Sequence, residues 1–263
     1  MTRLRAARYG GQGGPDGRAD HYSYSVYADP AMAEAFDSLR FSGPIGRLIA
    51  QTQEQVVASF LAPVEGKTIL DVGTGTGRAA LALAARRARV TGVDASAEML
   101  AVAERRAAAA KLDVAFLRGD AHGLTFPDRS FDAVVCLRVL MHTPDWRRSL
   151  GEVCRVAGDR VVFDYPALGS AAVLQAVVRR VAHRLGARTE PYRVFSRRAV
   201  AAALRANGFR IVDLHRQFVL PIAFHKQLNS AAATGRIEGA LARVGLARFF
   251  GSPVTVAAER CAS

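Results

Sequence analysis

The clearest chemical signal in this chain is a set of three glycines at alternate positions, Gly73, Gly75 and Gly77, directly after a short apolar run. The run, residues 69–72, predicts a buried strand, and residues 79–85 predict the start of a helix. Glycine permits tight backbone angles and leaves no Cβ between the main chain and a bound molecule. A strand that turns into a helix through glycines therefore predicts a binding loop for a nucleotide-like ligand.

Two classes of ligand use such a loop, and this motif alone leaves both open. The dinucleotide fingerprint G-x-G-x-x-A fits Gly75, Gly77 and Ala80 loosely. The pattern acid-x-G-x-G-x-G, which begins here with Asp71, fits at every position. Asp71 also has a purely structural interpretation, because its carboxylate could cap N–H groups of the loop. The following motifs must separate the two ligand classes.

Acidic residues also end the next two predicted strands. The segment 90–94 ends in Asp94, 17 residues after the last glycine of the loop, and the segment 116–121 contains Asp120. That spacing is expected for the next strand of a βαβ unit, where a carboxylate can accept both ribose hydroxyls. Ser96 is a good N-cap for the helix that follows.

A fourth strand is predicted over residues 131–138, and His142 follows it. A histidine at this place either faces the reacting atoms as a base or supports another group from behind. Cys136, inside the apolar strand, is interpreted as a small buried hydrophobic residue. His122, beside Asp120, is interpreted as a loop residue and not as a base.

Taken in order, the four motifs from residue 69 to residue 142 resemble the class I S-adenosylmethionine-dependent methyltransferases, most of all the small-molecule enzymes related to quinone biosynthesis. The resemblance covers residues 45–165 well. It implies an α/β fold with a doubly wound, seven-stranded, mostly parallel sheet, N-terminal helices and helical insertions as a lid. It also implies S-adenosyl-L-methionine as cofactor and methyl transfer to a small, partly hydrophobic acceptor through O, C or N.

The resemblance further implies roles for single residues. The glycine loop would pass under the methionine part of the cofactor, Asp94 would hold the ribose hydroxyls, and Asp120 would accept from the adenine amino group. His142 is the candidate base for an acceptor that must lose a proton. The implied cofactor-binding residues within the motifs are Asp71, Gly73, Thr74, Gly75, Thr76, Gly77, Asp94, Ala95, Met99, Asp120, Ala121, Leu137 and Arg138.

Residues 31–39 and 45–61 predict two helices ahead of the sheet, which in the resembling enzymes cover the cofactor. Tyr27 and Arg47 are candidates for this cover, because an arginine can pair with the cofactor carboxylate through two hydrogen bonds. The alternative is ordinary packing of a surface helix. Residues 1–20 have the composition of a disordered tail.

The rest of the chain, 21–263, is interpreted as one methyltransferase domain with cover helices over 21–62 and a cofactor-binding half over 63–166. Its C-terminal half carries two insertions, 168–186 and 221–251, each after a predicted strand. Helices are expected over 168–185 in the first and over 237–249 in the second. Because ligands of open α/β sheets bind beyond the C-terminal strand ends, the insertions predict a lid over the acceptor pocket. The residues expected to make that pocket apolar are Phe218, Phe224, Phe249 and Phe250.

The formal net charge is +13, and residues 151–263 hold most of the surplus, with 17 basic and 7 acidic side chains. An anionic substrate, an anionic membrane surface, nucleic acid and a merely solvated basic face are the possible explanations. Nucleic acid is disfavoured because the basic residues are not interleaved with aromatic ones. No apolar run reaches the roughly 18 residues of a membrane span, so only peripheral membrane contact stays open.

Three cysteines without ligand spacing predict no metal site and favour a reducing, cytoplasmic location. The oligomeric state is open, a dimer included. Two other functions are weighed against methyl transfer: a nicotinamide-dependent oxidoreductase, which leaves Asp71 and Asp120 unexplained, and a non-catalytic module that binds the cofactor without turnover.

Overall fold

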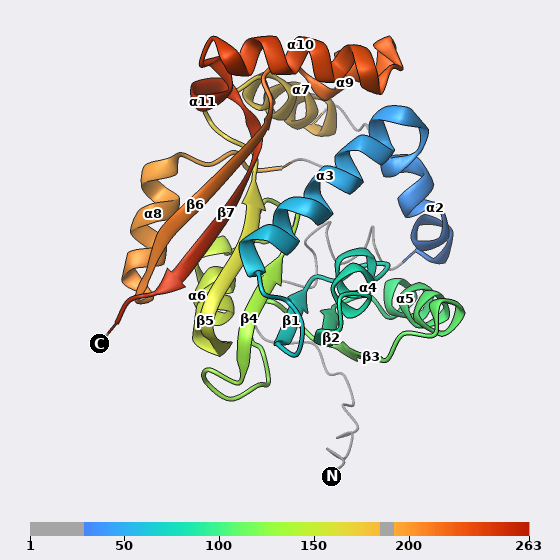
Figure 1. The fold of residues 1–263 in the computed structure, drawn as a ribbon, viewed down its shortest axis with the longest axis vertical. Helices are drawn as coiled ribbons and strands as arrows, with labels where there is room; N and C mark the ends of the chain where they lie inside the picture. Colours follow the sequence, from blue (N-terminus) through green and yellow to red (C-terminus); the bar gives the residue numbers. More distant parts are fainter. Residues whose placement is uncertain (1–28, 185–191, 263) are drawn as a thin grey trace.

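A seven-stranded sheet forms the centre of the computed structural model, which describes residues 29–184 and 192–262 (Figure 1). The predicted tail 1–20 and Tyr27 lie outside these residues. The strand order is β3-β2-β1-β4-β5-β7-β6. The strands are β1 (Thr68–Val72), β2 (Arg89–Asp94), β3 (Val114–Arg118), β4 (Phe131–Cys136), β5 (Ala157–Tyr165), β6 (Phe209–Phe218) and β7 (Ser252–Arg260).

Strands β1 to β5 are parallel, and β7 runs antiparallel to both of its neighbours. This confirms the predicted mostly parallel sheet. From β1 the chain first adds β2 and β3 on one side and then crosses to β4 on the other. Such a reversal opens a crevice at the carboxyl ends of β1 and β4, where ligands of open α/β sheets bind.

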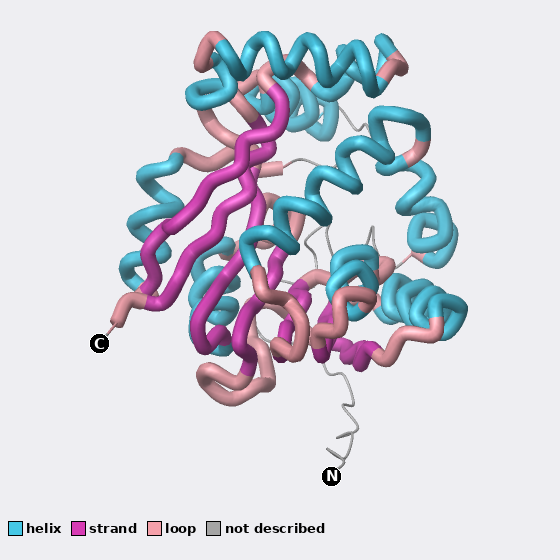
Figure 2. Tube along the Cα trace, in the orientation of Figure 1, coloured by secondary structure: helices cyan, strands magenta, loops and turns pink. Residues whose placement is uncertain are grey.

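Helices cover both faces of the sheet, as Figure 2 shows. Along β1, Ile69 packs into a core with residues of α3 and α4, whereas its neighbour Leu70 packs into a second core with residues of α6 and α8. Both side chains are fully buried, so the apolar run of β1 packs against a helical layer on each face of the sheet. The sheet is therefore doubly wound. The helices are α2 (Pro30–Phe41), α3 (Gly43–Leu61), α4 (Arg78–Ala84), α5 (Ala97–Ala110), α6 (Trp146–Val156), α7 (Ala172–Arg184), α8 (Arg197–Ala206), α9 (Ile222–Leu228), α10 (Ala231–Arg243) and α11 (Leu246–Phe250).

Three element boundaries differ from the sequence-based expectation. The helix expected from residue 168 begins at Ala172. The backbone at Leu168 is not helical, because its N–H donates to the carbonyl of Phe195 at 2.8 Å. The helix expected over 237–249 is split into α10 and α11 by Gly245, whose φ of 82° is left-handed. The fourth strand ends at Cys136, two residues early.

The cover helices and the insertions lie around the crevice. The Thr76 hydroxyl of the glycine loop donates to Asp37 of α2 at 3.0 Å, which ties the first cover helix to the loop. The insertions follow the carboxyl end of β5 and the end of β6, and α7, α9, α10 and α11 gather at that end of the molecule (Figure 1). In the described part of the chain, every helix falls short of the length and apolarity that crossing a membrane requires.

Candidate functional site

The glycine loop connects β1 to α4 and is held against the end of β2. The backbone N–H groups of Gly73 and Thr74 both donate to the carbonyl of Val93, at 2.7 and 3.0 Å. Gly73 has a φ of 68°, and a Cβ there would lie 2.2 Å from a methyl carbon of Val139, so no side chain fits. Gly75 has a φ of 55° and open space where a Cβ would project. The loop therefore exposes bare backbone to the pocket that it lines.

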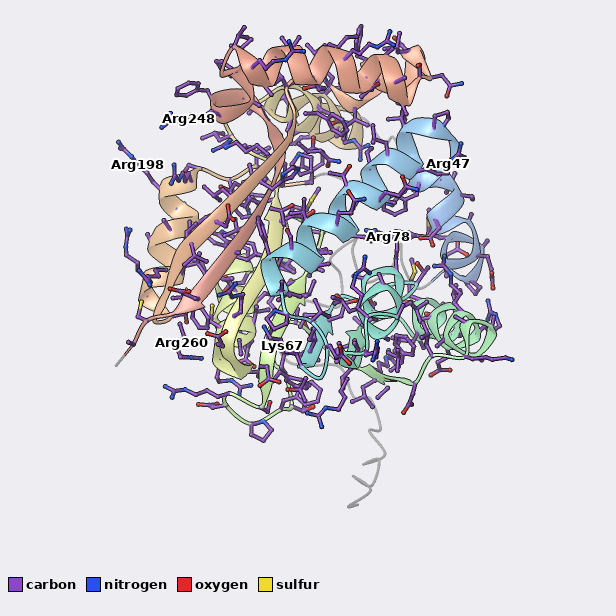
Figure 3. The ribbon with its side chains drawn as sticks, viewed as in Figure 1. Arg47, Lys67, Arg78, Arg198, Arg248 and Arg260 are labelled. Carbon is purple, nitrogen blue, oxygen red and sulfur yellow. The ribbon has the colours of Figure 1, made fainter. Side chains whose placement is uncertain are left out.

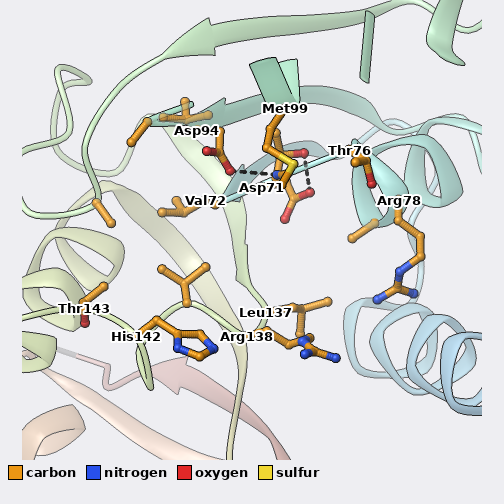
Figure 4. Close-up of a pocket in the computed structure, with 18 of the residues that line it drawn as sticks. Asp71, Val72, Thr76, Arg78, Asp94, Met99, Leu137, Arg138, His142 and Thr143 are labelled. Atoms are coloured by element: carbon orange, nitrogen blue, oxygen red, sulfur yellow. Dashed lines mark hydrogen bonds between the residues drawn. The ribbon is translucent and has the colours of Figure 1, made fainter. Parts of the chain in front are cut away.

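Asp94 ends β2 and faces this pocket. Its carboxylate accepts from the backbone N–H of Gly75 at 2.8 Å (Figure 4). It also accepts from the backbone N–H of Ser96 at 2.9 Å. Two bonds leave acceptor capacity on the same two oxygens, since a carboxylate offers about four lone-pair sites. Burial raises the pKa of Asp94 above its ordinary value, against these hydrogen bonds. Asp94 can therefore stabilise the glycine loop and still accept hydrogen bonds from ribose hydroxyls.

Asp71 lies in the floor of the same pocket and is only 2% exposed. It accepts from the hydroxyl of Thr74 at 2.8 Å. Burial raises its pKa from 3.8 to about 6, while the Thr74 hydrogen bond opposes the shift. The acid therefore both stabilises the loop and contributes a titratable carboxyl to the pocket.

Asp120 lines the pocket together with the buried side chain of Met99. The imidazole Nδ1 of His122 lies 2.7 Å from the carboxylate of Asp120, and the backbone N–H of His122 donates to it at 2.9 Å. Because the Asp145 N–H points at Nε2, at 3.4 Å, Nδ1 is the nitrogen that donates to Asp120. His122 is thus a positioning residue for Asp120, a role that sequence reasoning missed although the two are only two positions apart.

Of the cover helices, α2 brings Arg40 to the pocket, whereas Arg47 of α3 is not among the lining residues. Arg47 is exposed on α3 and does not line the pocket, whereas Arg78, at the start of α4, lies between α3 and α4 and does (Figure 3). The Arg78 guanidinium lies 4.4 Å over the ring of Phe41 and pairs with Glu54 at 3.4 Å. The expectation for Arg47 is therefore not met, because its position on the helix turns it to solvent. The signal for Arg78 was its place directly after the last glycine.

A network of hydrogen bonds between buried polar groups supports the pocket wall opposite the glycine loop. Arg138 has a left-handed φ of 61°, uncommon for a residue with a side chain. Its backbone N–H donates to Asp164, at the end of β5, at 2.5 Å, and Gln53 of α3 donates to the other oxygen of Asp164 at 3.0 Å. Gln53 also accepts from Arg78. The strained backbone at residue 138 is thereby fixed from three elements, and the Arg138 side chain lines the pocket.

His142 lies where the pocket meets a second, larger cavity of about 610 Å³. It is 7% exposed and lies across the pocket from Asp71 and Asp94 (Figure 4). Both hollows also share Arg40 and Arg138. An acceptor in the larger cavity would thus meet a ligand of the glycine loop beside these three side chains.

The inserted segments line the larger cavity, but three of the four phenylalanines expected there do not. Phe218 is buried and lines it. Phe224, Phe249 and Phe250 are 43%, 64% and 47% exposed and lie outside the lining. The expectation for these three is wrong because helical spacing cannot tell which apolar face of a short helix is covered.

Most of the predicted cofactor-binding residues are brought together by the fold. Gly77, which caps α4, and Arg47 are the exceptions, and Tyr27 lies outside the described residues. Cys136 and Cys154 are buried, and burial raises the pKa of both thiols, that of Cys154 to about 12. Within residues 29–184 and 192–262, no three histidine, cysteine or acidic side chains are grouped as a metal site requires. The predicted residues that line the pocket are Asp71, Gly73, Thr74, Gly75, Thr76, Asp94, Ala95, Met99, Asp120, Ala121, Leu137, Arg138 and His142.

Comparison with known proteins places this fold and site. A family described as a methyltransferase domain matches residues 69–159. The chain is 33% identical over 190 residues to a demethylmenaquinone methyltransferase of Clavibacter sepedonicus, covering 65% of this chain and 77% of that one. It is 45% identical over 105 residues to the enzyme of the same name from Thermus thermophilus, covering 38% of this chain and 48% of the relative. The chain thus spans about half the length of the Thermus relative.

The fold is also similar to that of solved methyltransferase structures. The crystal structure of a magnesium protoporphyrin IX methyltransferase from Synechocystis, with bound SAH, matches 91% of this chain and 98% of its own at a TM-score of 0.65 and 18% identity. Fold and site define a class I, Rossmann-like methyltransferase. Within that class, the chain belongs to the S-adenosylmethionine-dependent methyltransferases related to those of quinone biosynthesis.

Proposed function

We propose that this chain transfers the methyl group of S-adenosylmethionine to a small, partly hydrophobic molecule. The observation that carries the proposal is the junction of two hollows, one at the glycine loop and one beneath the inserted helices, which share Arg40, Arg138 and His142. Donor and acceptor would occupy separate cavities and meet at these residues. Much of the rate enhancement of a group transfer can come from such positioning and from exclusion of water.

The residues of the loop-side pocket fit the cofactor. When bound there, S-adenosylmethionine supplies a methyl group made electrophilic by its sulfonium. Asp94 would hold the ribose hydroxyls, and Asp120, oriented by His122, would accept from the adenine amino group. Arg78 and Arg138 would take the place first expected for Arg47 beside the cofactor carboxylate.

His142 would act as the base for an acceptor that loses a proton during attack, since it lines both hollows. The apolar part of the larger cavity favours an acceptor with a hydrophobic portion. Demethylmenaquinone, the compound in the names of the Clavibacter and Thermus relatives, is therefore the first acceptor to test.

The test is transfer of labelled methyl groups from S-adenosylmethionine to demethylmenaquinone and, in parallel, into a fractionated cell extract, with mass analysis of any labelled product. A labelled small molecule supports the proposal. Cofactor binding without any labelled product favours the non-catalytic module instead. The proposal is wrong if calorimetry detects no binding of S-adenosylmethionine or S-adenosylhomocysteine and an Asp94→Ala variant behaves identically.

Family membership favours the methyl donor over nicotinamide, the other cofactor considered. A cytoplasmic location, a dimer and peripheral contact with a membrane remain predictions from the sequence. Fractionation and sedimentation experiments would test them.

A further inference from the structure

The larger cavity is built in part by the two inserted segments, and each brings a cation to it. On α7, Ala172, Gln175 and Arg179 line the cavity. Their spacing of three and four residues places them on one face of the helix. On α9, Ile222 and Lys226 line it, again four residues apart. Both insertions therefore turn one mixed polar and apolar face toward the same hollow.

This cavity is lined by more cations than carboxylates among the residues that the structure describes. Its described lining residues include Arg40, Arg138, Arg179 and Lys226 but a single carboxylate, Asp164. That carboxylate is fully buried and accepts hydrogen bonds from a side-chain amide and a backbone N–H of the protein itself. Cations gathered in a partly enclosed hollow raise the local concentration of anions and strengthen their binding.

The four cations divide into two pairs by position. Arg40 and Arg138 also line the cofactor pocket, whereas Arg179 and Lys226 line the larger cavity alone. The guanidinium of Arg179 lies 5.6 Å from the centre of the Tyr192 ring. The hydroxyl of that buried tyrosine lies 3.1 Å from each of two oxygens of α7, so the ring is fixed against the helix. Arg179 is thus held over an ordered platform in a part of the cavity outside the glycine-loop pocket.

Apolar side chains make up much of the remaining wall. Ile49, Met141, Phe218 and Ile222 are among them. A volume of about 610 Å³ lies within the range of small-molecule sites. The cavity therefore combines an apolar body with cations that are separate from those beside the cofactor.

We propose that the methyl acceptor is an anionic amphiphile, whose carboxylate or phosphate binds Arg179 and Lys226 while its apolar body lies along Ile49 and Phe218. The acceptor atom then lies at the other end, beside Arg138 and His142. This inference rests on the proposed function, because it assigns the chemical class of substrate to the same site. It also accounts for part of the basic surplus in the C-terminal half. Demethylmenaquinone carries neither a carboxylate nor a phosphate, so its methylation would support the proposed function and count against this inference.

Binding of matched ten-carbon probes tests the inference without knowledge of the natural acceptor. Decyl phosphate, decanoate and decanol are titrated by calorimetry into the full chain saturated with S-adenosylhomocysteine. We expect at least one of the two anionic probes to bind about tenfold or more tightly than decanol, with the preference decreasing as salt is added. The carboxylate and phosphate arms decide which anionic group the site takes.

The Arg179→Gln/Lys226→Gln variant should lose the preference for anions and keep its affinity for S-adenosylhomocysteine. Arg180→Gln/Arg243→Gln is the matched control, because it removes the same charge from residues outside the cavity lining. Arg179→Lys/Lys226→Arg keeps both charges and should keep the preference, which separates loss of charge from loss of folding.

The inference is overturned if decanol binds the unchanged chain as tightly as both anions, if neither anion binds, or if the preference survives in the double glutamine variant. These outcomes differ from failure of the proposed function, which would appear as absent binding of S-adenosylhomocysteine before any probe is added.

Discussion

Asp94 accepts a hydrogen bond from the backbone N–H of Gly75 at 2.8 Å, so the acid at the end of β2 is latched to the loop that follows β1. The two residues lie 19 positions apart and meet because β1 and β2 are parallel neighbours whose carboxyl ends share one edge of the sheet. One carboxylate can thus order the loop before any ligand is bound and still accept hydroxyl groups afterwards.

Removing this latch should weaken cofactor binding. We expect Asp94→Ala to lower the affinity for S-adenosylmethionine by about 10–100-fold, because it removes acceptors for both the loop and the ligand. Isothermal calorimetry measures the change. Asp113→Ala, an exposed acid after α5, is the matched control and should bind normally. Equal affinities in the two variants would contradict the role of Asp94.

The raised pKa of Asp71 should appear in the pH dependence of folding. The pKa of this carboxyl is 3.8 in the unfolded chain and about 6 in the folded one. As the pH rises, the unfolded chain therefore loses this proton at a lower pH than the folded chain does. The free energy of unfolding therefore falls as the pH rises from about 4 to about 6, by up to ~3 kcal/mol, and stays level above that range.

Asp71→Asn should remove this contribution. The stability difference between the variant and the unchanged chain, measured by urea unfolding without cofactor, should shift in favour of the variant between about pH 4.5 and about pH 7. A difference that is the same at both pH values would show that Asp71 does not titrate in this way.

Asp120 and His122 should act as one unit. We expect Asp120→Ala and His122→Ala each to weaken binding of S-adenosylhomocysteine about five- to tenfold, and the double variant to lose little more than Asp120→Ala alone. Calorimetric affinities for the four proteins form the cycle. Additive losses would mean that His122 does not act through Asp120.

His142 should matter for turnover more than for cofactor affinity. If the acceptor loses a proton during attack, His142→Gln should lower kcat by about 10²–10⁴-fold and leave the affinity for S-adenosylhomocysteine within about fivefold. His215→Gln, on β6 and outside both hollows, is the control. Unchanged turnover with demethylmenaquinone or the labelled extract product would remove His142 from the mechanism.

Glu238 should anchor the second insertion. It accepts from Nε2 of the buried His225 at 2.7 Å and from the backbone N–H groups of Val219 and Leu220 at 2.8 and 3.0 Å. Because Glu238→Ala leaves these donors without an acceptor, we expect a loss of about 2–4 kcal/mol in the free energy of unfolding. Urea unfolding measures it, and the exposed Glu104→Ala should change little. A loss no larger than that control would argue against the anchor.

The sequence by itself determined the glycine-loop side of the pocket. The glycine loop, Asp71, Asp94 and Asp120 each stand at the end of a short apolar strand, and parallel strands bring such ends to one edge whatever the rest of the chain does. Helix capping by Ser96, whose hydroxyl accepts from Met99 at 3.0 Å, is equally local and was predicted correctly.

Only the tertiary structure decided the pocket wall opposite the glycine loop and the arrangement of the inserted helices. Three features depend on how helices pack across the sheet. Arg78 and not Arg47 lines the pocket, Asp164 of β5 fixes the backbone of Arg138, and Phe249 is exposed. Such contacts join residues far apart in the chain, and helical periodicity states that a face is apolar without stating what covers it. The charge of the larger cavity could not be predicted from the sequence either, since Arg179 and Lys226 come from two insertions that meet only in the folded molecule.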